Sequence, residues 1–397
     1  MTERSAGTAG APDGNDAAVA IVGAGVVGLA VACALAPSHS VAVIERHEGP
    51  ARETSSHNSG VIHAGIFYAA GSLKHRLCLE GNRALYDWCE ARGVMVRRSG
   101  KLIVAIEPSE VDGLEVVLAQ ARANAVPGVS RLSGAQARAI EPAVPAVAAL
   151  HSQSTGVVDA FGYARSLEAA AREAGVLFAY RHELTGVERA GGGTFRLALR
   201  GPDGAPAELR AAALVNCAGL RAHEVAAALG YSLDGAEGLP VLRQRVNRGR
   251  YYDVVSGPSA RAVTRPIYPV PAHSGDLPAQ LRSAGGLGVH ITVDTDGAVH
   301  LGPDTEWLPE GAPLDYRADD SRRAAFLAAG QRLLPSLRDE EIAPGQVGYR
   351  PKLQRPGEEP ADFLVWADRG YIHLGGIESP GLTCSLPLAR MVAELLR

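Results

Sequence analysis

The sequence predicts an α/β protein, α+β overall, in which a Rossmann-like nucleotide-binding domain is interleaved with a mainly antiparallel-sheet domain. The first observation is an apolar run, 19–22, that leads into Gly23-Ala-Gly25-Val-Val-Gly28. The second is another apolar run, 41–44, that ends in Glu45. Together they have the order of a βαβ dinucleotide-binding unit. The third is the segment from 240 to about 310, whose Tyr, Pro and β-branched residues between turn signals are typical of an antiparallel sheet.

Each glycine of the turn has a separate physical role. Gly23 permits the tight turn off the strand, Gly25 lets the backbone approach a pyrophosphate, and Gly28 lets the helix pack closely on the sheet. The free N–H groups at the helix start, next to Val27, favour an anion there. Glu45 is expected to accept hydrogen bonds from a ribose diol. The competing interpretation is a glycine-rich turn in an unrelated α/β protein.

The composition excludes several classes of protein. The formal net charge of −4 gives no electrostatic reason to expect a nucleic-acid partner. The five cysteines have no metal-ligand spacing, which predicts no metal site, and reduced cytoplasm is the natural compartment. No run of about 18 apolar residues predicts a transmembrane helix, while peripheral contact with the inner membrane stays open. Residues 1–16 have the composition of a disordered tail.

Further elements follow the chain in order. Residues 72–93 have the apolar periodicity of a helix, and 214–219 form an apolar strand that we expect to return to the dinucleotide sheet. A Gly/Pro loop at 375–385 precedes a final helix predicted at 386–396. No second G-x-G-x-x-G follows a strand, so the sequence predicts a single bound dinucleotide. The chain contains 36 arginines but only three lysines: Lys74, Lys101 and Lys352.

Several motifs carry a resemblance to a known family. They are Thr54-x-x-His57-Asn-Ser-Gly-Val-Ile-His63-x-Gly-Ile-x-Tyr68, Ile267-Tyr-Pro-Val-Pro271, Gly288-Val-His290, Gly348-x-Arg350-Pro-Lys352 and Ile377-Glu-Ser-Pro-Gly-Leu-Thr383. The chain resembles the L-2-hydroxyglutarate dehydrogenase/oxidase family, within the D-amino-acid-oxidase-like flavoproteins, as a bacterial side branch. This resemblance implies FAD as the cofactor. It also implies an FAD-binding domain built from 17–95, 151–238 and 335–397, and a substrate-binding domain built from 96–150 and 239–334.

The resemblance and the glycine turn together assign a set of residues to FAD. The polar loop after the second strand is expected to run beside the pyrophosphate and ribityl chain, Val187 to contact the adenine, and the loop near 380 to approach the flavin pyrimidine edge. The full cofactor set is Gly23, Gly25, Val27, Gly28, Glu45, Arg46, Thr54, Ser55, Ser56, His57, Asn58, Ser59, Gly60, His63, Val187, Ala218, Gly219, Gly376, Glu378, Gly381, Leu382 and Thr383. For His57 a covalent bond to FAD is the alternative to simple contact.

Oxidation of a hydroxy acid requires a base for the hydroxyl proton, and histidine suits this role near neutral pH. His63 and His290 are the catalytic candidates, with His63 expected close to the flavin and His290 on the substrate face. The sequence leaves open which of them is the base. Recognition of a carboxylate requires cations and hydroxyls. The candidates for this role are Arg248, Tyr251, Tyr268, Arg350 and Lys352.

The expected function is therefore FAD-dependent oxidation of a small carboxylated substrate, an L-2-hydroxy acid converted to the 2-oxo acid by hydride transfer to flavin N5. An amine or amino-acid oxidase of the glycine or sarcosine oxidase type is the first alternative, and a flavin-binding protein without turnover is the second. The expected electron acceptor is O2, a quinone or an electron-transfer partner, and the sequence does not distinguish among them.

Overall fold

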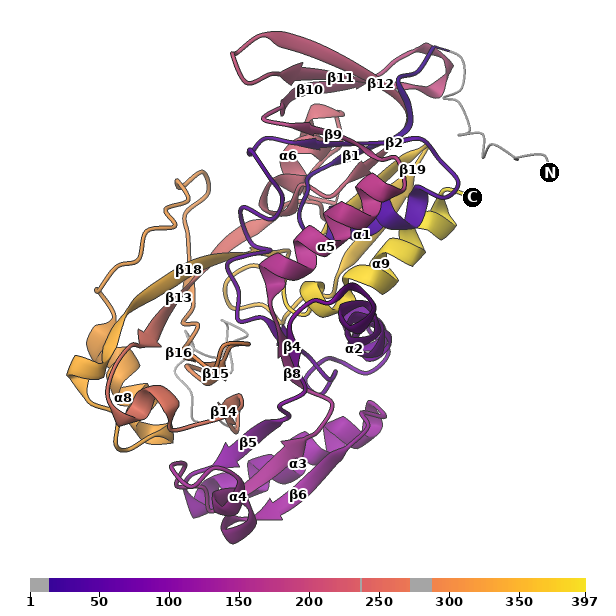
Figure 1. Ribbon diagram of the computed structural model, residues 1–397. Coiled ribbons are helices and arrows are strands. Elements are labelled where there is room, and N and C mark those ends of the chain that lie inside the picture. Colours follow the sequence, from indigo (N-terminus) through magenta and orange to yellow (C-terminus); the bar gives the residue numbers. More distant parts are fainter. Residues whose placement is uncertain (1–13, 236–237, 272–287) are drawn as a thin grey trace, which may run out of the picture.

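A computed structural model describes residues 14–235, 238–271 and 288–397 (Figure 1). The predicted tail therefore lies outside the described residues, except for its last three positions. The described chain forms two large sheets joined by a small one, and a group of helices packs against each large sheet. This arrangement confirms the predicted fold class.

The first large sheet holds the dinucleotide unit. Its order is β10-β11-β12-β1-β2-β9, with β20 beside β12 and β19 beside β20. The pairs β1–β2, β1–β12, β2–β9 and β12–β20 are parallel, and the others are antiparallel. The strands are β1 (Ala17–Val22), β2 (Val41–Glu45), β9 (Leu177–Tyr180), β10 (Glu183–Arg189), β11 (Phe195–Arg200), β12 (Pro206–Asn216), β19 (Leu364–Asp368) and β20 (Tyr371–Gly375).

Strand β1 is buried on both faces, which explains its continuous apolar run. Val19 and Ile21 face a core to which α2 (Leu73–Arg92) contributes, together with three helices that Figure 1 shows stacked on one side of the sheet: α1 (Val26–Leu35), α5 (Ala160–Glu173) and α9 (Gly381–Leu395). Ala20 and Val22 face the opposite core, which includes residues of β11 and of α6 (Ala222–Ala228). The predicted return of 214–219 to this sheet is confirmed, because β12 pairs in parallel with β1.

The second large sheet is mainly antiparallel, as predicted, with one parallel pair between β14 and β5. Its order is β17-β13-β16-β15-β14-β5-β7-β6, with β18 along β13. The strands are β5 (Lys101–Ala105), β6 (Val129–Ser133), β7 (Ala148–Ser152), β13 (Arg245–Val254), β14 (Ile267–Pro269), β15 (Ile291–Val293), β16 (Val299–Leu301), β17 (Glu306–Trp307) and β18 (Ile342–Lys352). Three helices accompany it: α3 (Val111–Ala123), α4 (Gly134–Ile140) and α8 (Arg323–Leu333).

Between the large sheets lie the long helix α2 (Leu73–Arg92) and a small antiparallel sheet of β3 (Val61–Ile62), β8 (Gly156–Val158) and β4 (Val96–Arg97). Helix α2 agrees with its predicted range of 72–93. Strand β18 belongs to the antiparallel sheet, although its residues fall in the last segment predicted for the FAD-binding domain. The division of the chain into domains stays a prediction.

The final helix begins five residues earlier than predicted, at Gly381 instead of 386. The prediction assigned 375–385 to a loop because glycine and proline usually interrupt helices. In the structure Pro387 lies inside the helix and has no N–H to donate to the carbonyl of Thr383. Helix α2 packs against that carbonyl at Gly81, where a Cβ would lie 2.1 Å from the Thr383 oxygen. The early start places the helix N-terminus, with Gly381 and Leu382, at the wall of the main cavity.

Candidate active site

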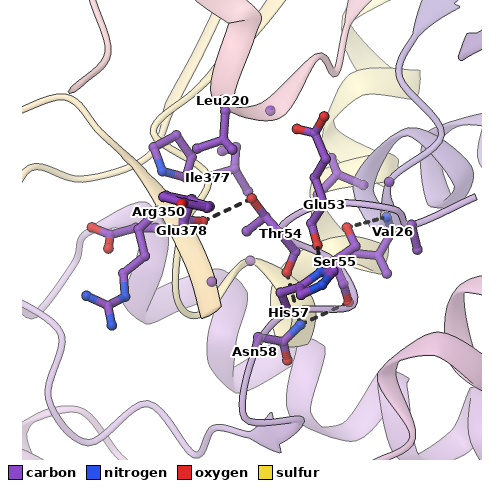
Figure 2. A pocket seen from close by; sticks show the side chains of 18 of the residues that line it. Val26, Glu53, Thr54, Ser55, His57, Asn58, Leu220, Arg350, Ile377 and Glu378 are labelled. Carbon is purple, nitrogen blue, oxygen red and sulfur yellow. Dashed lines mark hydrogen bonds between the residues drawn. The ribbon is translucent and has the colours of Figure 1, made fainter. Parts of the chain in front are cut away.

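A cavity of about 780 Å³ is lined by residues of both large sheets. It is lined at one end by the carboxyl ends of β1 and β2 and at the other by residues of β13, β18 and the loop before α9. In open parallel sheets the crevice outside the strand carboxyl ends is the usual ligand site. Figure 2 shows Val26 and Ser55 on one side of the pocket, and Arg350 and Glu378 on the other.

The glycine turn has the close contacts that the motif predicts. Gly23 has φ +104°, and a Cβ on it would lie 2.5 Å from the carbonyl oxygen of Cys217. A Cβ on Gly28 would lie 2.0 Å from the carbonyl oxygen of Gly23. Gly28 therefore lets α1 begin directly against the turn, although it does not itself line the cavity. Gly23, Gly25 and Val27 do line it.

Two side chains stabilise this turn through hydrogen bonds within the protein. Glu45 accepts hydrogen bonds from the backbone N–H of Ala24 (2.9 Å) and of His47 (2.9 Å). The hydroxyl of Ser55 accepts the N–H of Val26 at the start of α1 (3.1 Å). Glu45 thus holds β2 and the turn together at the place where the sequence predicts ribose.

The polar loop after β2 joins the turn to the antiparallel sheet (Figure 2). Thr54 donates to the carbonyl of Tyr349 on β18 (3.0 Å), and Ser59 bonds the hydroxyl of Tyr251 on β13 (3.0 Å). The Asn58 amide donates to the carbonyls of Thr54 and Ser55. These bonds give the loop one conformation along the cavity wall.

The remaining cofactor candidates separate into two groups. Beyond the turn and loop residues already placed, Arg46, His57, His63, Ala218, Gly219, Glu378, Gly381 and Leu382 line the cavity. Ser56, Gly60, Val187, Gly376 and Thr383 lie behind its wall.

Val187 is part of an apolar core, and the cavity is lined instead by Thr185 and Gly186, the two residues before it. Arg46 forms an ion pair with Glu53, which also lines the cavity and which the sequence did not single out. Burial alone would raise the pKa of the Glu53 carboxyl. Hydrogen bonds and charges from His47 and Arg46 outweigh this effect and lower that pKa overall.

The two catalytic candidates both line the cavity but differ in their partners. His290 is 8% exposed, and its Nδ1 lies 3.0 Å from the carbonyl oxygen of Gly288. Because a carbonyl can only accept, Nδ1 carries the proton and Nε2 keeps its lone pair. His63 instead places Nε2 3.1 Å from the hydroxyl of Ser379. Burial lowers the pKa of each histidine to about 3, so both are neutral near neutral pH.

The predicted carboxylate-binding residues have different environments. Arg350 lines the cavity and donates only to neutral groups, the side-chain oxygen of Asn247 (2.6 Å) and the carbonyl of Asp304 (2.9 Å). Arg248, next to the lining residue Gly249 on β13, does not itself line the cavity and is paired with Glu306 at 2.6 Å. Within the described chain, Arg350 has no carboxylate partner, so its charge is available to a ligand.

Tyr251 and Tyr268 also line the cavity, and the ring of Tyr268 lies 3.9 Å from that of His290, measured between centroids. Lys352 lines the cavity as well, but its Nζ is paired with Glu378 at 2.6 Å. Arg350, the two tyrosines and His290 thus form one face, to which β13, β14 and β18 each contribute.

Lys101 was not singled out as a site residue by the sequence. It is 1% exposed, with its Nζ 4.3 Å from the ring centroid of Tyr268 and 5.0 Å from that of Phe67. In the described chain it has no ion-pair partner, and burial lowers its pKa to about 7. Its rarity, as one of three lysines, was the signal available in the sequence.

The residues present fit FAD. The glycine turn leaves no room for a Cβ, the start of α1 faces the cavity, and an acid ends β2, which together match an adenine dinucleotide. The cavity continues past this end to the histidines and Arg350, which gives space for a second, reacting ring system. Among the described residues no cluster of His, Cys, Asp or Glu could hold a metal ion. Of the helices that the structure describes, none is both long and apolar enough to span a membrane.

Comparison with known proteins agrees with this geometry. The family model "DAO: FAD dependent oxidoreductase" matches residues 18–395. The mitochondrial L-2-hydroxyglutarate dehydrogenase of Arabidopsis thaliana is 33% identical, over 94% of this chain and 82% of that protein. The human mitochondrial L-2-hydroxyglutarate dehydrogenase is 30% identical, over 95% and 88%. An L-2-hydroxyglutarate dehydrogenase of Escherichia coli is 27% identical, over 94% and 92%.

Solved structures are similar over nearly the whole chain. The dithionite-reduced L-alpha-glycerophosphate oxidase of Mycoplasma pneumoniae, with FAD bound, has a TM-score of 0.81 at 25% identity and covers 96% of this chain and 94% of its own. Glycine oxidase from Geobacillus kaustophilus has a TM-score of 0.75 at 20% identity, over 96% and 94%, and shows the fold alone. The expected family and cofactor are confirmed: the chain belongs to the DAO family of FAD-dependent oxidoreductases.

Proposed function

We propose that this enzyme oxidises a small L-2-hydroxy acid of the 2-hydroxyglutarate type to the 2-oxo acid. The observation that carries the proposal is the pairing of an arginine free of carboxylate partners with a neutral histidine on one cavity face. The curated relatives named L-2-hydroxyglutarate dehydrogenase support the same substrate class. When bound, FAD supplies the acceptor of the hydride.

In this proposal Arg350 binds the substrate carboxylate. Its guanidinium is oriented by Asn247 and by the carbonyl of Asp304, and an arginine fork matches a carboxylate with two parallel hydrogen bonds. Room for the guanidinium depends on Gly249, since a Cβ there would lie 2.3 Å from an Arg350 nitrogen. The substrate carboxylate would then pair with a charge that, among the described residues, no carboxylate neutralises.

His290 takes the hydroxyl proton. The carbonyl of Gly288 fixes the tautomer, so the nitrogen available to the substrate is the basic one. Tyr251 and Tyr268 enclose the same face and exclude water from it. His63, bonded to Ser379, belongs to the wall beside the cofactor, and we assign it a positioning role.

The test is an anaerobic titration of the purified holoenzyme, followed by the visible flavin absorbance. L-2-hydroxyglutarate should bleach the flavin, the D enantiomer should not, and lactate should do so only at much higher concentration. Bleaching by glycine or sarcosine alone would overturn the proposal in favour of an amine oxidase. No bleaching by any acid or amine, with dithionite still effective, would favour a flavoprotein without turnover.

Three finer assignments belong to the same proposal. Reoxidation of the reduced holoenzyme in air, with hydrogen peroxide formed, would identify O2 as the acceptor, whereas reoxidation only by a quinone analogue would identify a quinone or an electron-transfer partner.

We place the enzyme in the cytoplasm, with peripheral contact to the inner membrane as the alternative, which cell fractionation distinguishes. FAD that stays in the pellet after acid precipitation would show a covalent bond through His57 or another residue.

A further inference from the structure

All three lysines of the chain are buried, in a protein that otherwise uses arginine for its basic residues. Lys74, Lys101 and Lys352 are 8%, 1% and 4% exposed. An ammonium is a compact point charge, whereas a buried guanidinium requires partners for five N–H donors. Lysine at these three positions therefore places compact positive charges where little water reaches them.

Two of these lysines meet at one carboxylate. The Oε1 atom of Glu378 lies 3.1 Å from Nζ of Lys74, and its Oε2 atom lies 2.6 Å from Nζ of Lys352. Glu378 is itself 8% exposed, and the neighbouring lysines lower the pKa of its carboxyl against the effect of burial. One buried carboxylate is thus shared by two ammonium groups.

Among the described residues, Glu378 is the one carboxylate that is ion-paired with the lysines of this cluster. Lys74 also donates to the carbonyl of Ala361 (2.8 Å) and lies over the ring of Phe363. Asp362 is the nearest other acid in this loop, but its oxygens accept the backbone N–H groups of Leu73 and Lys74 at the start of α2. Asp362 therefore caps a helix and is not ion-paired with the lysines.

The cluster borders one particular end of the cavity. Glu45, Thr185 and Gly186 line the end where the ribose and adenine are expected, and the glycine turn follows. Lys352 and Glu378 line the opposite end, with Arg350 and His290, where the reacting ring must lie for the substrate face to be used. Figure 2 shows Glu378 and Arg350 on that side, away from Val26 and Ser55.

We propose that Lys74, Glu378 and Lys352 form a buried charge cluster that sets the reduction potential of the bound flavin. Lys352 supplies positive charge at the cavity wall, Lys74 supplies it from behind the wall, and Glu378 moderates both. A positive charge in a poorly solvated wall favours the reduced, anionic flavin over the oxidised, neutral one. The inference rests on the FAD dependence of the family and does not depend on the proposed substrate.

The proposal predicts shifts of opposite sign. Lys352→Met and Lys74→Met remove positive charge and should lower the reduction potential, while Glu378→Gln removes negative charge and should raise it. A cluster that only holds the loop in place would instead give loss of FAD or stability in all three variants, without this sign pattern. Lys352→Arg keeps the charge and should leave the potential close to that of the wild type.

The experiment is dye-coupled anaerobic reduction of each purified holoenzyme by xanthine and xanthine oxidase, after its FAD content is measured. The ratio of reduced to oxidised flavin at a fixed dye potential should change at least tenfold in each direction, about 30 mV for a two-electron couple. The control is Arg92→Met, which breaks an exposed ion pair between α2 and α5 (2.8 Å) and should change nothing.

Shifts of the same sign, or shifts no larger than that of Arg92→Met, would overturn the proposal. If Lys352→Met does not retain FAD, Lys74→Met carries the test, because Lys74 does not line the cavity. Neither result depends on which acid is oxidised, since the electrons come from xanthine. Failure of the substrate titration and failure of this inference are therefore distinguishable.

Discussion

The two ends of the cavity are built differently. At the dinucleotide end, the positions that matter are backbone atoms and glycines within a few residues of each other, as at Gly23 and Gly28. At the substrate end, the positions that matter are side chains brought together from distant strands, as where Arg350 bonds Asn247, 103 residues away in the chain. The comparison teaches that one end is specified by local steric limits and the other by strand register and electrostatics. Substitutions should therefore fail in different ways at the two ends.

The largest effect is expected from Gly28→Val. Any Cβ at this position would lie 2.0 Å from the carbonyl oxygen of Gly23, so the helix must move away from the turn. We expect the purified protein to contain no FAD, measured as the ratio of visible to ultraviolet absorbance. Gly191→Ala is the control, because nothing lies within 4 Å of a Cβ there. A Gly28→Val protein with a full complement of FAD would contradict the steric interpretation of this end.

His290→Gln should affect chemistry and leave the dinucleotide end intact. Loss of the base should lower the rate of flavin reduction by about 10²–10⁴-fold, with FAD content unchanged. Stopped-flow reduction under anaerobic conditions measures this rate. His63→Gln, as the companion variant, should show the smaller loss. If His63→Gln shows the larger loss, the two histidines exchange roles.

Arg350→Met should raise the substrate concentration needed for reduction. Loss of a charged partner for a buried carboxylate costs about 2–5 kcal/mol, which is a loss in kcat/KM of about 30-fold to several thousand-fold. Arg248→Met is the matched control on the neighbouring strand. Its ion pair with Glu306 is partly exposed and worth at most about 1 kcal/mol, so kcat/KM should change less than about fivefold. Equal losses in the two variants would remove Arg350 as the specific anchor.

Lys101→Met should change the free energy of unfolding, and this change should depend on pH. Burial lowers the pKa of Lys101 from 10.5 to about 7, so between these values the unfolded chain binds more protons than the folded one. The wild-type free energy of unfolding therefore rises with pH across this window, and the penalty of the buried ammonium is fully present below pH 7. The variant should be more stable by about 1–3 kcal/mol at pH 6, and this gain should shrink as the pH rises toward 10.5, so that it is small at pH 10. Denaturant unfolding at the two pH values measures this, and an equal gain at both would exclude the titration of Lys101 as its cause.

The sequence was most informative where the constraint is local. The glycine turn, the acid after β2 and the long helix α2 follow from spacing within a few dozen residues, and all three were predicted. The final helix begins earlier than predicted because the end of the predicted Gly/Pro loop, from Gly381, is helical. Gly81 of α2 packs against the Thr383 carbonyl, which Pro387 leaves without its usual helical donor. The side chain of Val187 points into an apolar core while Gly186, one residue earlier, lines the cavity, and the backbone contact of Val187 with the adenine stays a prediction.

The substrate end could be predicted only as a set of residue types. Arginines at 248 and 350 are equivalent in the sequence, and only strand pairing gives Glu306 to one and Asn247 to the other. The same limit applies to Lys352, whose partner Glu378 lies in a loop 26 residues further along the chain. The surroundings of Lys101 could not be predicted from the sequence, because its aromatic neighbours come from other segments and one of them depends on the pairing of β5 with β14.

Strand β20 and helix α9 complete the first large sheet and its core, although they come late in the chain, and this order affects how the protein folds during synthesis. The glycine turn is synthesised well before the cavity wall formed by 377–382 and before β20, the parallel strand beside β12. A ribosome-bound chain therefore exposes the apolar faces of β1 and α1 while their late partners do not yet exist. We expect the cavity wall and this core to be completed together once α9 has been made, so the supply of FAD in the cell should influence how much of the protein escapes proteolysis.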